Sequence, residues 1–101
     1  MEIIMKNMTL ERITEVCDGV YYGSETDKTK EITGAVIDSR QVEPGYLFIA
    51  VKGEKVDGHR FIPQVFEKGA LAVLSEQELS DPAGPYIRVE STLGAMKKLA
   101  A

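Results

Sequence analysis

The fold of this chain is limited most by one continuous apolar run, residues 46–51, which reads Tyr-Leu-Phe-Ile-Ala-Val. The run is rich in residues that favour β-strands and has no alternation of polar with apolar side chains. A strand of that composition is buried on both faces, as strands are in a sheet with helices packed on both sides. We therefore expect a small layered α/β domain, with a mixed or mostly parallel sheet and flanking helices.

Segments typical of helices and of strands alternate on either side of this run. Apolar residues at helical spacing predict one helix between caps at Thr9 and Asp18, a second from Phe61 to Lys68, and a third that Ser91 begins. Shorter apolar segments predict strands at residues 20–22, 32–37, 70–74 and 86–89. This order of elements favours an α/β domain over a sandwich or a helix bundle.

Two connecting segments have clear local signals. Residues 42–45 (Val-Glu-Pro-Gly) predict a type II turn, because Pro44 fixes its own φ and Gly45 can adopt a positive φ. Residues 23–30 are polar and charged, which predicts an exposed loop. The third helical pattern continues to Ala101 without a stop signal, which indicates a domain cut from a longer chain.

Size and charge exclude several classes of partner. The chain has 101 residues, the size of one domain, and a net charge of −4. Its only adjacent basic pair is Lys97-Lys98, which argues against nucleic acid, since affinity for nucleic acid rests on clustered basic residues. The longest uncharged stretch, residues 44–51, is far shorter than the ~20 apolar residues of a membrane span. Glu2 stands where a signal peptide carries positive charge, so we expect a cytoplasmic protein.

Residues typical of catalysis and metal binding are few. Cys17 is the only cysteine, which excludes an internal disulfide and a multi-cysteine zinc site, and its helical spacing predicts a buried, inert thiol. His59, the only histidine, is either a general base or a helix-capping or surface residue, and the second interpretation is favoured. Glu76 and Glu78 lie in a polar loop and are expected to be solvated. The chain has no phosphate loop, no dinucleotide fingerprint and no nucleophile elbow, so we predict neither catalytic nor metal-binding residues in it.

Asp38-Ser39-Arg40 is one of two segments with more polar chemistry than folding requires, and it stands where a strand pattern ends. Ligands of open α/β sheets bind at the ends of strands, a serine hydroxyl can donate to a phosphate oxygen, and an arginine can bind phosphate through two parallel bonds. The alternative, favoured by spacing alone, is a local turn in which Arg40 pairs with Asp38.

Residues 52–59 (Lys-Gly-Glu-Lys-Val-Asp-Gly-His) form the second segment, directly after the strongest strand pattern. Glycines there let backbone amides approach a ligand closely, and Lys52 and Lys55 could add positive charge for a diphosphate. An ordinary surface loop has the same composition, so this segment alone leaves both interpretations open.

Taken together, the two segments resemble a known family. Residues 32–34 (Ile-Thr-Gly), 38–53 (Asp-Ser-Arg-Gln-Val-Glu-Pro-Gly-Tyr-Leu-Phe-Ile-Ala-Val-Lys-Gly) and 57–62 (Asp-Gly-His-Arg-Phe-Ile) are similar to the N-terminal domain of the Mur ligases. Residues 67–73 and 86–89 continue the resemblance, which covers nearly the whole chain. Tyr46 departs from it, because the family usually has Asp after Pro-Gly, and we expect a surface change that leaves the turn intact.

The resemblance implies a binding site for the UDP end of a UDP-N-acetylmuramoyl-peptide. Ser39 would meet the diphosphate, with Ile37 and Asp38 shaping the strand end beside it. Arg40 would either bind or hold the turn through Asp38. The expected contacts of the second segment with the uridine or its phosphates are Gly53, Glu54, Lys55 and Val56. Residues 57–59 are expected to stabilise the loop rather than touch the ligand.

The resemblance also implies partners and cofactors outside this chain. Residues 1–101 would be a single UDP-precursor-binding domain of a peptidoglycan ligase, whose central domain binds ATP and Mg²⁺ and whose C-terminal domain brings the incoming amino acid or dipeptide. The reaction would run through an acyl phosphate, so this chain alone would be inactive. The segment from Met8 to Gly19 is more like the member that adds D-alanyl-D-alanine than the one that adds the third peptide residue. A structural module without a small-molecule site is the alternative from another class.

Overall fold

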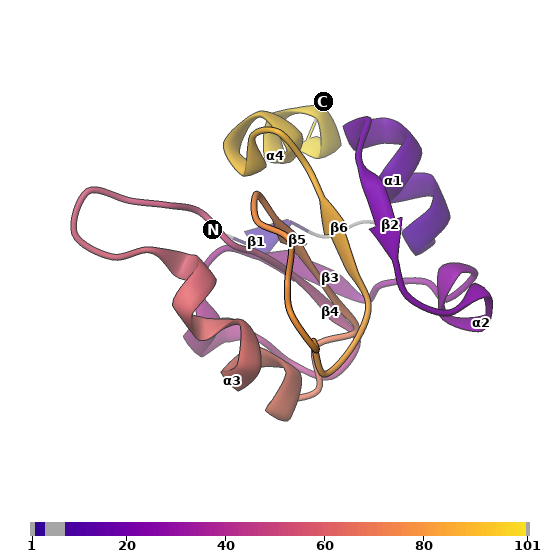
Figure 1. Ribbon diagram of the computed structural model, residues 1–101, viewed down its shortest axis with the longest axis horizontal. Coiled ribbons are helices and arrows are strands. Elements are labelled where there is room, and N and C mark those ends of the chain that lie inside the picture. Colours follow the sequence, from indigo (N-terminus) through magenta and orange to yellow (C-terminus); the bar gives the residue numbers. More distant parts are fainter. Residues whose placement is uncertain (1, 4–7, 101) are drawn as a thin grey trace.

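The computed structural model describes residues 2–3 and 8–100, so Ala101 and most of the segment used to argue against a signal peptide lie outside the described residues. Within these residues the chain forms one sheet of six strands in the order β1-β3-β4-β5-β6-β2 (Figure 1). The strands are β1 (Glu2–Ile3), β2 (Val20–Tyr22), β3 (Gly34–Val36), β4 (Tyr46–Ile49), β5 (Ala72–Ser75) and β6 (Tyr86–Arg88). Strands β3 to β6 are parallel, and β1 and β2 pair antiparallel at the two edges. The predicted mixed, mostly parallel sheet is confirmed.

Helices cover both faces of the sheet. They are α1 (Leu10–Cys17), α2 (Glu25–Lys28), α3 (Ile62–Glu67) and α4 (Thr92–Ala100), with 3₁₀ turns η1 (Ser39–Gln41) and η2 (Gly58–Phe61). Figure 1 shows α1 and α4 on one side of the sheet and α3 on the other. No helix within residues 2–3 and 8–100 has the length and hydropathy needed to cross a membrane.

Strand β4 lies at the centre of the packing, as its composition predicts. Leu47 and Ile49 face the core formed with α1 and α4, and Phe48 and Ala50 face the core formed with α3. All four are fully buried. Since both faces of the strand are covered by helices, a run without polar alternation is what this position requires.

The predicted helix caps are present. Thr9 Oγ1 accepts a hydrogen bond from Arg12 N (3.1 Å), and Asp18 ends α1 in the left-handed region with φ 55°. Ser91 Oγ accepts from Gly94 N (3.0 Å) at the start of α4. Cys17 is buried as predicted, and this burial raises the pKa of its thiol to about 11.

The prediction of an exposed loop at residues 23–30 is wrong in part, because α2 lies there. Ser24 Oγ accepts from Asp27 N (3.0 Å), and the Asp27 carboxylate pairs with Lys30 at 2.7 Å. None of the four residues of α2 is buried. A helix with no buried side chain has no apolar periodicity by which the sequence could reveal it.

The type II turn is confirmed, but the expectation that Tyr46 is a surface residue is wrong. Gly45 has φ +86°, and Tyr46 N donates to Glu43 O (3.1 Å). Tyr46 is only 9% exposed and its hydroxyl donates to the Glu43 carboxylate (3.2 Å). Its ring lies over Gly34, its partner in the β3–β4 register, where a Cβ would stand 2.9 Å from ring atoms. The missing side chain of Gly34 makes room for the aromatic ring.

Candidate functional site

The carboxyl ends of the parallel strands β3 to β6 lie side by side along one margin of the sheet, which we call the carboxyl edge. Ligands of parallel α/β sheets bind at this margin. A surface cavity of about 540 Å³ opens there between the turn after β3, the loop after β4 and helix α3. It is lined by Ile37, Asp38, Ser39, Arg40, Val51, Gly53, Val56, Gly58, Phe61, Gln64 and Lys68. Of the predicted site residues, the structure thus brings together Ile37, Ser39, Arg40, Gly53 and Val56.

The turn after β3 is built on Asp38. Its Oδ1 accepts from Arg40 N (2.9 Å) and Nε (3.0 Å), and its Oδ2 accepts from Arg40 Nη2 (2.8 Å). The Arg40 side chain is 86% exposed. Hydrogen bonds from Arg40, first those of its guanidinium and then that of its backbone N–H, lower the pKa of the Asp38 carboxyl to about 2. The local pairing of Arg40 with Asp38 is therefore the arrangement that the structure has.

Ser39 sits between this pair and helix α3. Lys68, the residue that ends α3, donates from Nζ to the Ser39 carbonyl at 3.0 Å. This bond joins the wall made by the β3 turn to the wall made by α3. The half-buried Ser39 side chain is thereby held on the cavity lining.

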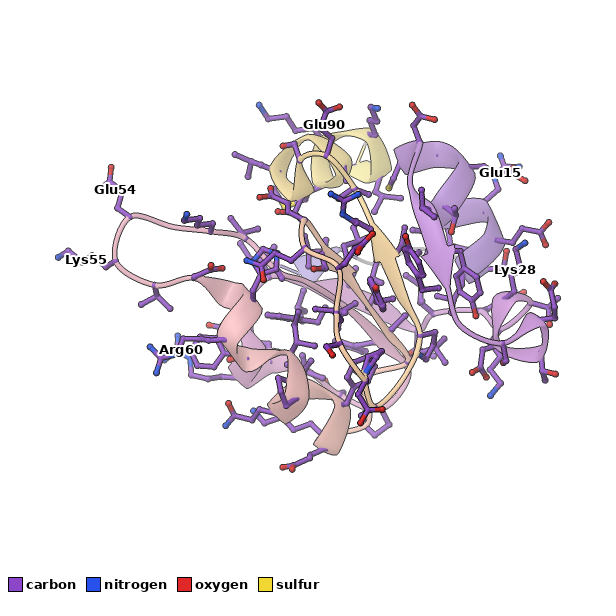
Figure 2. All side chains as sticks on the ribbon, in the orientation of Figure 1. Glu15, Lys28, Glu54, Lys55, Arg60 and Glu90 are labelled. Carbon is purple, nitrogen blue, oxygen red and sulfur yellow. The ribbon has the colours of Figure 1, made fainter. Side chains whose placement is uncertain are left out.

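The loop after β4 is a narrow hairpin. Gly58 N donates to Val51 O and Gly53 N to Val56 O, both at 2.9 Å, with a bridge between Lys52 and Asp57. Figure 2 shows Glu54 and Lys55 at the tip of this hairpin, pointing away from the body of the domain. Neither lines the cavity, so the structure separates these two predicted contacts from the others. The amide of Gly53 is already used within the hairpin.

His59 is held from both sides of its ring. Asp57 Oδ1 accepts from His59 N (3.0 Å) and lies 2.6 Å from Nδ1, while Nε2 accepts the Glu76 backbone N–H at 2.9 Å. Because a backbone N–H can only donate, Nε2 carries no proton and Nδ1 carries the hydrogen. With 6% of its side chain exposed, His59 is neither a surface residue nor a base open to a substrate. Bonds from His59, the backbone one first, lower the pKa of Asp57.

The hydrogen bonds continue from Glu76 to helix α4. Glu76 Oε2 accepts from Thr92 N (2.9 Å) and Thr92 Oγ1 (3.1 Å). The expectation that Glu76 is simply solvated is therefore wrong, because the end of β5 brings it against the first residue of α4. We call Asp57, His59, Glu76 and Thr92 the histidine bridge. It ties together the segments that follow β4, β5 and β6.

The sequence did not point to the cavity wall made by α3. Gln64 and Lys68 are four residues apart and therefore lie on one face of that helix, beside Phe61 at its start. The available signal was this polar i, i+4 pair, combined with the rule that a crossover between parallel strands is right-handed. That rule places α3 over β4 and near the β3 turn.

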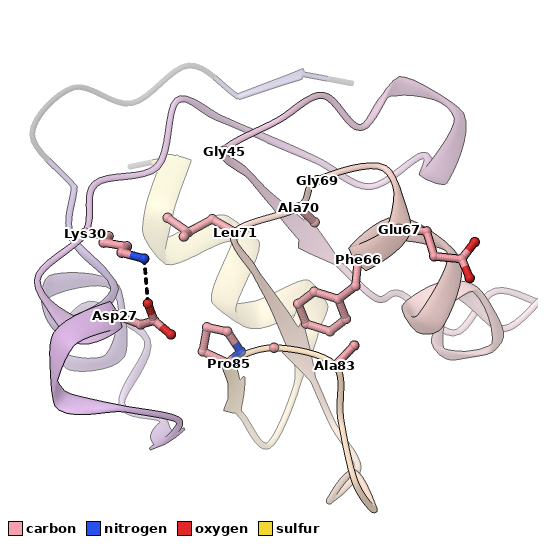
Figure 3. A pocket seen from close by; sticks show the side chains of 11 residues that line it. Asp27, Lys30, Gly45, Phe66, Glu67, Gly69, Ala70, Leu71, Ala83 and Pro85 are labelled. Carbon is pink, nitrogen blue, oxygen red and sulfur yellow. Dashed lines mark ion pairs between the residues drawn. The ribbon is translucent and has the colours of Figure 1, made fainter.

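A second cavity, of about 420 Å³, lies at the amino ends of the parallel strands, opposite the carboxyl edge, near Gly45, Ala70 and Pro85 (Figure 3). The Asp27–Lys30 ion pair forms part of its wall. None of the predicted site residues lines it. Within residues 2–3 and 8–100, no three Asp, Glu, His or Cys side chains are grouped so that they could hold a metal ion.

Comparison with known proteins connects this geometry to a family. Residues 31–101 match the family described as Mur ligase family, catalytic domain. A UDP-N-acetylmuramoyl-L-alanyl-D-glutamate–2,6-diaminopimelate ligase of Geobacter sulfurreducens is 44% identical over 95 residues, which are 93% of this chain and 18% of that protein. A UDP-N-acetylmuramoyl-tripeptide–D-alanyl-D-alanine ligase of Bacillus subtilis is 37% identical over 98 residues, 95% of this chain and 21% of that protein. The chain thus spans about a fifth of the length of these relatives.

Two solved structures show the same fold. MurF from Acinetobacter baumannii superposes with a TM-score of 0.73 and 27% identity, over 89% of this chain and 19% of that one. MurF ligase from Thermotoga maritima, in complex with ADP, has a TM-score of 0.59 and 35% identity, over 64% of this chain and 15% of that one. Both agree with the layered α/β architecture expected from the sequence.

Proposed function

The chain belongs to the Mur ligase family, and we propose that residues 1–101 are the N-terminal, substrate-docking domain of an ATP-dependent peptidoglycan-precursor ligase. The domain holds the UDP end of a UDP-N-acetylmuramoyl-peptide. The observation that carries this proposal is the cavity at the carboxyl edge, which gathers Ile37, Ser39, Arg40, Gly53 and Val56 from two distant segments.

The chemistry of the cavity suits a nucleotide with a charged end. Ser39 contributes a hydroxyl that can donate to a phosphate oxygen. Val56 is 48% exposed and lines the same cavity as Val51 and Phe61, which together offer apolar surface to a base. Glu54 and Lys55 reach a ligand only if the hairpin folds over it, since they stand at its tip.

For the reaction of the whole protein we propose addition of D-alanyl-D-alanine to a UDP-N-acetylmuramoyl-tripeptide. The similarity to the Bacillus subtilis ligase of that name and to two MurF structures supports this assignment. The alternative is the ligase that adds the third peptide residue, which the 44% identity to the Geobacter sulfurreducens protein favours.

ATP and Mg²⁺ belong, in this proposal, to the remaining domains of the protein, and ADP in the Thermotoga maritima structure is consistent with that division. ATP would activate the substrate carboxylate there. The residues of this chain bind and orient the nucleotide end of the substrate, and none of them takes part in bond making. A cytoplasmic location and the lack of a nucleic-acid partner stay predictions.

A two-dimensional amide NMR titration of this chain with uridine, UDP and UDP-N-acetylmuramic acid tests the docking role. We expect shifts at residues 37–40 and 53–56, at millimolar ligand because contacts in other domains are missing. Ser39→Ala should weaken UDP binding about 3- to 10-fold. The matched control is Ser80→Ala, in an exposed loop outside the cavity lining, which should bind UDP like the wild type. A structural module without a small-molecule site predicts no shifts at any concentration.

A further inference from the structure

The charges that line the cavity do not cancel. Its charged lining residues are Asp38, Arg40 and Lys68. The first two neutralise each other through a two-pronged ion pair. What is left at the cavity wall is the positive charge of Lys68.

Lys68 is placed to use that charge on a ligand. Its ammonium donates to the Ser39 carbonyl at 3.0 Å, a neutral acceptor that does not offset the charge. An ammonium has three donors, so this bond leaves two for another acceptor. Ser39 and Lys68 both line the cavity and are joined by this bond, so the Ser39 hydroxyl and the Lys68 ammonium belong to the same stretch of cavity wall.

The other lysines near this edge are less well placed. Lys55 stands at the tip of the hairpin, away from the body of the domain, and Lys52 is not part of the cavity lining. The positive charge of Arg40 is already offset by Asp38, with which it makes two side-chain bonds. Glu67, the neighbour of Lys68, lines the cavity at the opposite edge and so does not offset its charge here.

We propose that Lys68 is the anion-binding residue of this cavity: its ammonium positions the Ser39 turn in the free protein and contacts the phosphate groups of the bound ligand. The proposal rests on the docking function above, and it adds a residue from α3 to a site expected only from the two segments after β3 and β4.

The test is a titration of the 101-residue chain with inorganic pyrophosphate at low ionic strength, followed by amide NMR. Pyrophosphate should shift residues 37–40 and 68 in the wild type. Lys68→Gln should weaken its binding about three- to fivefold, and Lys68→Arg should retain it. Lys97→Gln, on the exposed face of α4, changes the net charge equally and should bind like the wild type. The difference in pyrophosphate affinity between Lys68→Gln and the wild type should become smaller at 1 M salt, where charges are screened within about 3 Å.

Two results overturn the proposal: no pyrophosphate shifts at the Ser39 turn of the wild type, or equal binding by Lys68→Gln and Lys97→Gln. Spectra of the free variants show whether the fold is intact. The docking function is judged separately with UDP and uridine. If pyrophosphate binds through Lys68 but UDP binds no more tightly than pyrophosphate, the anion site stands and the UDP role fails. If UDP binds and Lys68→Gln is without effect, docking stands and the role of Lys68 fails.

Discussion

Two turns at the carboxyl edge of the sheet have the same local structure and opposite surroundings. Asp38-Ser39-Arg40 follows β3 and Asp57-Gly58-His59 follows the hairpin after β4. The two aspartates have nearly identical backbone angles, φ −99° and ψ 118° against φ −97° and ψ 115°. In each turn Oδ1 accepts the backbone N–H of the residue two positions on, at 2.9 and 3.0 Å. In each, the basic side chain of that residue folds back onto the same carboxylate.

The far end of the basic side chain is where the turns differ. Arg40 is 86% exposed beyond its aspartate, whereas His59 is 6% exposed and reaches the Glu76 amide. The first turn therefore stays open to a ligand, and the second closes the edge by joining three segments through the histidine bridge. An Asp-x-basic sequence determines the turn, and the tertiary surroundings determine its role.

The largest expected contrast comes from removing the two basic side chains. His59→Ala leaves the half-buried Glu76 N–H without its acceptor and removes a side chain that is only 6% exposed, which should lower the free energy of unfolding by about 2–4 kcal/mol. Arg40→Ala removes a solvent-exposed ion pair and should leave the free energy of unfolding nearly unchanged. Urea unfolding measures both.

His59→Gln is the control for the role of Nε2, because its side-chain oxygen can accept from Glu76 N–H. It should recover part of the stability that His59→Ala loses. Equal losses in His59→Ala and Arg40→Ala would contradict the distinction between an open and a closed turn.

The middle residues of the turns give the next contrast. A Cβ on Gly58 would lie 3.0 Å from both N and O of Val51, so Gly58→Ser should destabilise the fold by about 1–3 kcal/mol. No close backbone contact requires a glycine at position 39. Ser39→Gly should lower the free energy of unfolding by about 1 kcal/mol or less, because glycine raises the conformational entropy of the unfolded chain. Thermal unfolding of the two variants compares them directly. A Gly58→Ser variant as stable as the wild type would mean that the hairpin neck can widen.

Features that depend on local sequence patterns could be predicted from the sequence alone. The buried strand β4, the turn at Gly45 and the caps at Thr9 and Ser91 depend on local patterns, and all were predicted correctly. The parallel topology and the family resemblance also predicted that the segments after β3 and β4 lie together. They did not predict which individual side chains contact each other between different elements.

Three of the differences between prediction and structure share one physical cause. Tyr46 is buried because the β3–β4 register sets it over Gly34, and Glu76 is bonded because β5 ends beside α4. Lys68 joins the cavity because α3 crosses back over the sheet toward Ser39. Register, strand order and crossover handedness decide such contacts, and none of them can be read from the composition of a single segment.

The smallest contrast concerns the two carboxylates. The pKa of Asp38 is lowered from 3.8 to about 2, with the Arg40 side chain as the largest cause, whereas backbone bonding is the largest cause at Asp57. A lowered carboxyl pKa stabilises the fold above pH 3.8, and this contribution is lost as the pH falls toward 2. Arg40→Gln should therefore raise the pKa of Asp38, leaving it somewhat below 3.8 because the backbone bond remains, and His59→Gln should raise that of Asp57 by less. Carboxyl ¹³C shifts in a pH titration report both values. If Asp38 titrates identically in Arg40→Gln and the wild type, the ion pair does not persist in solution, and Arg40 is free to bind the ligand after all.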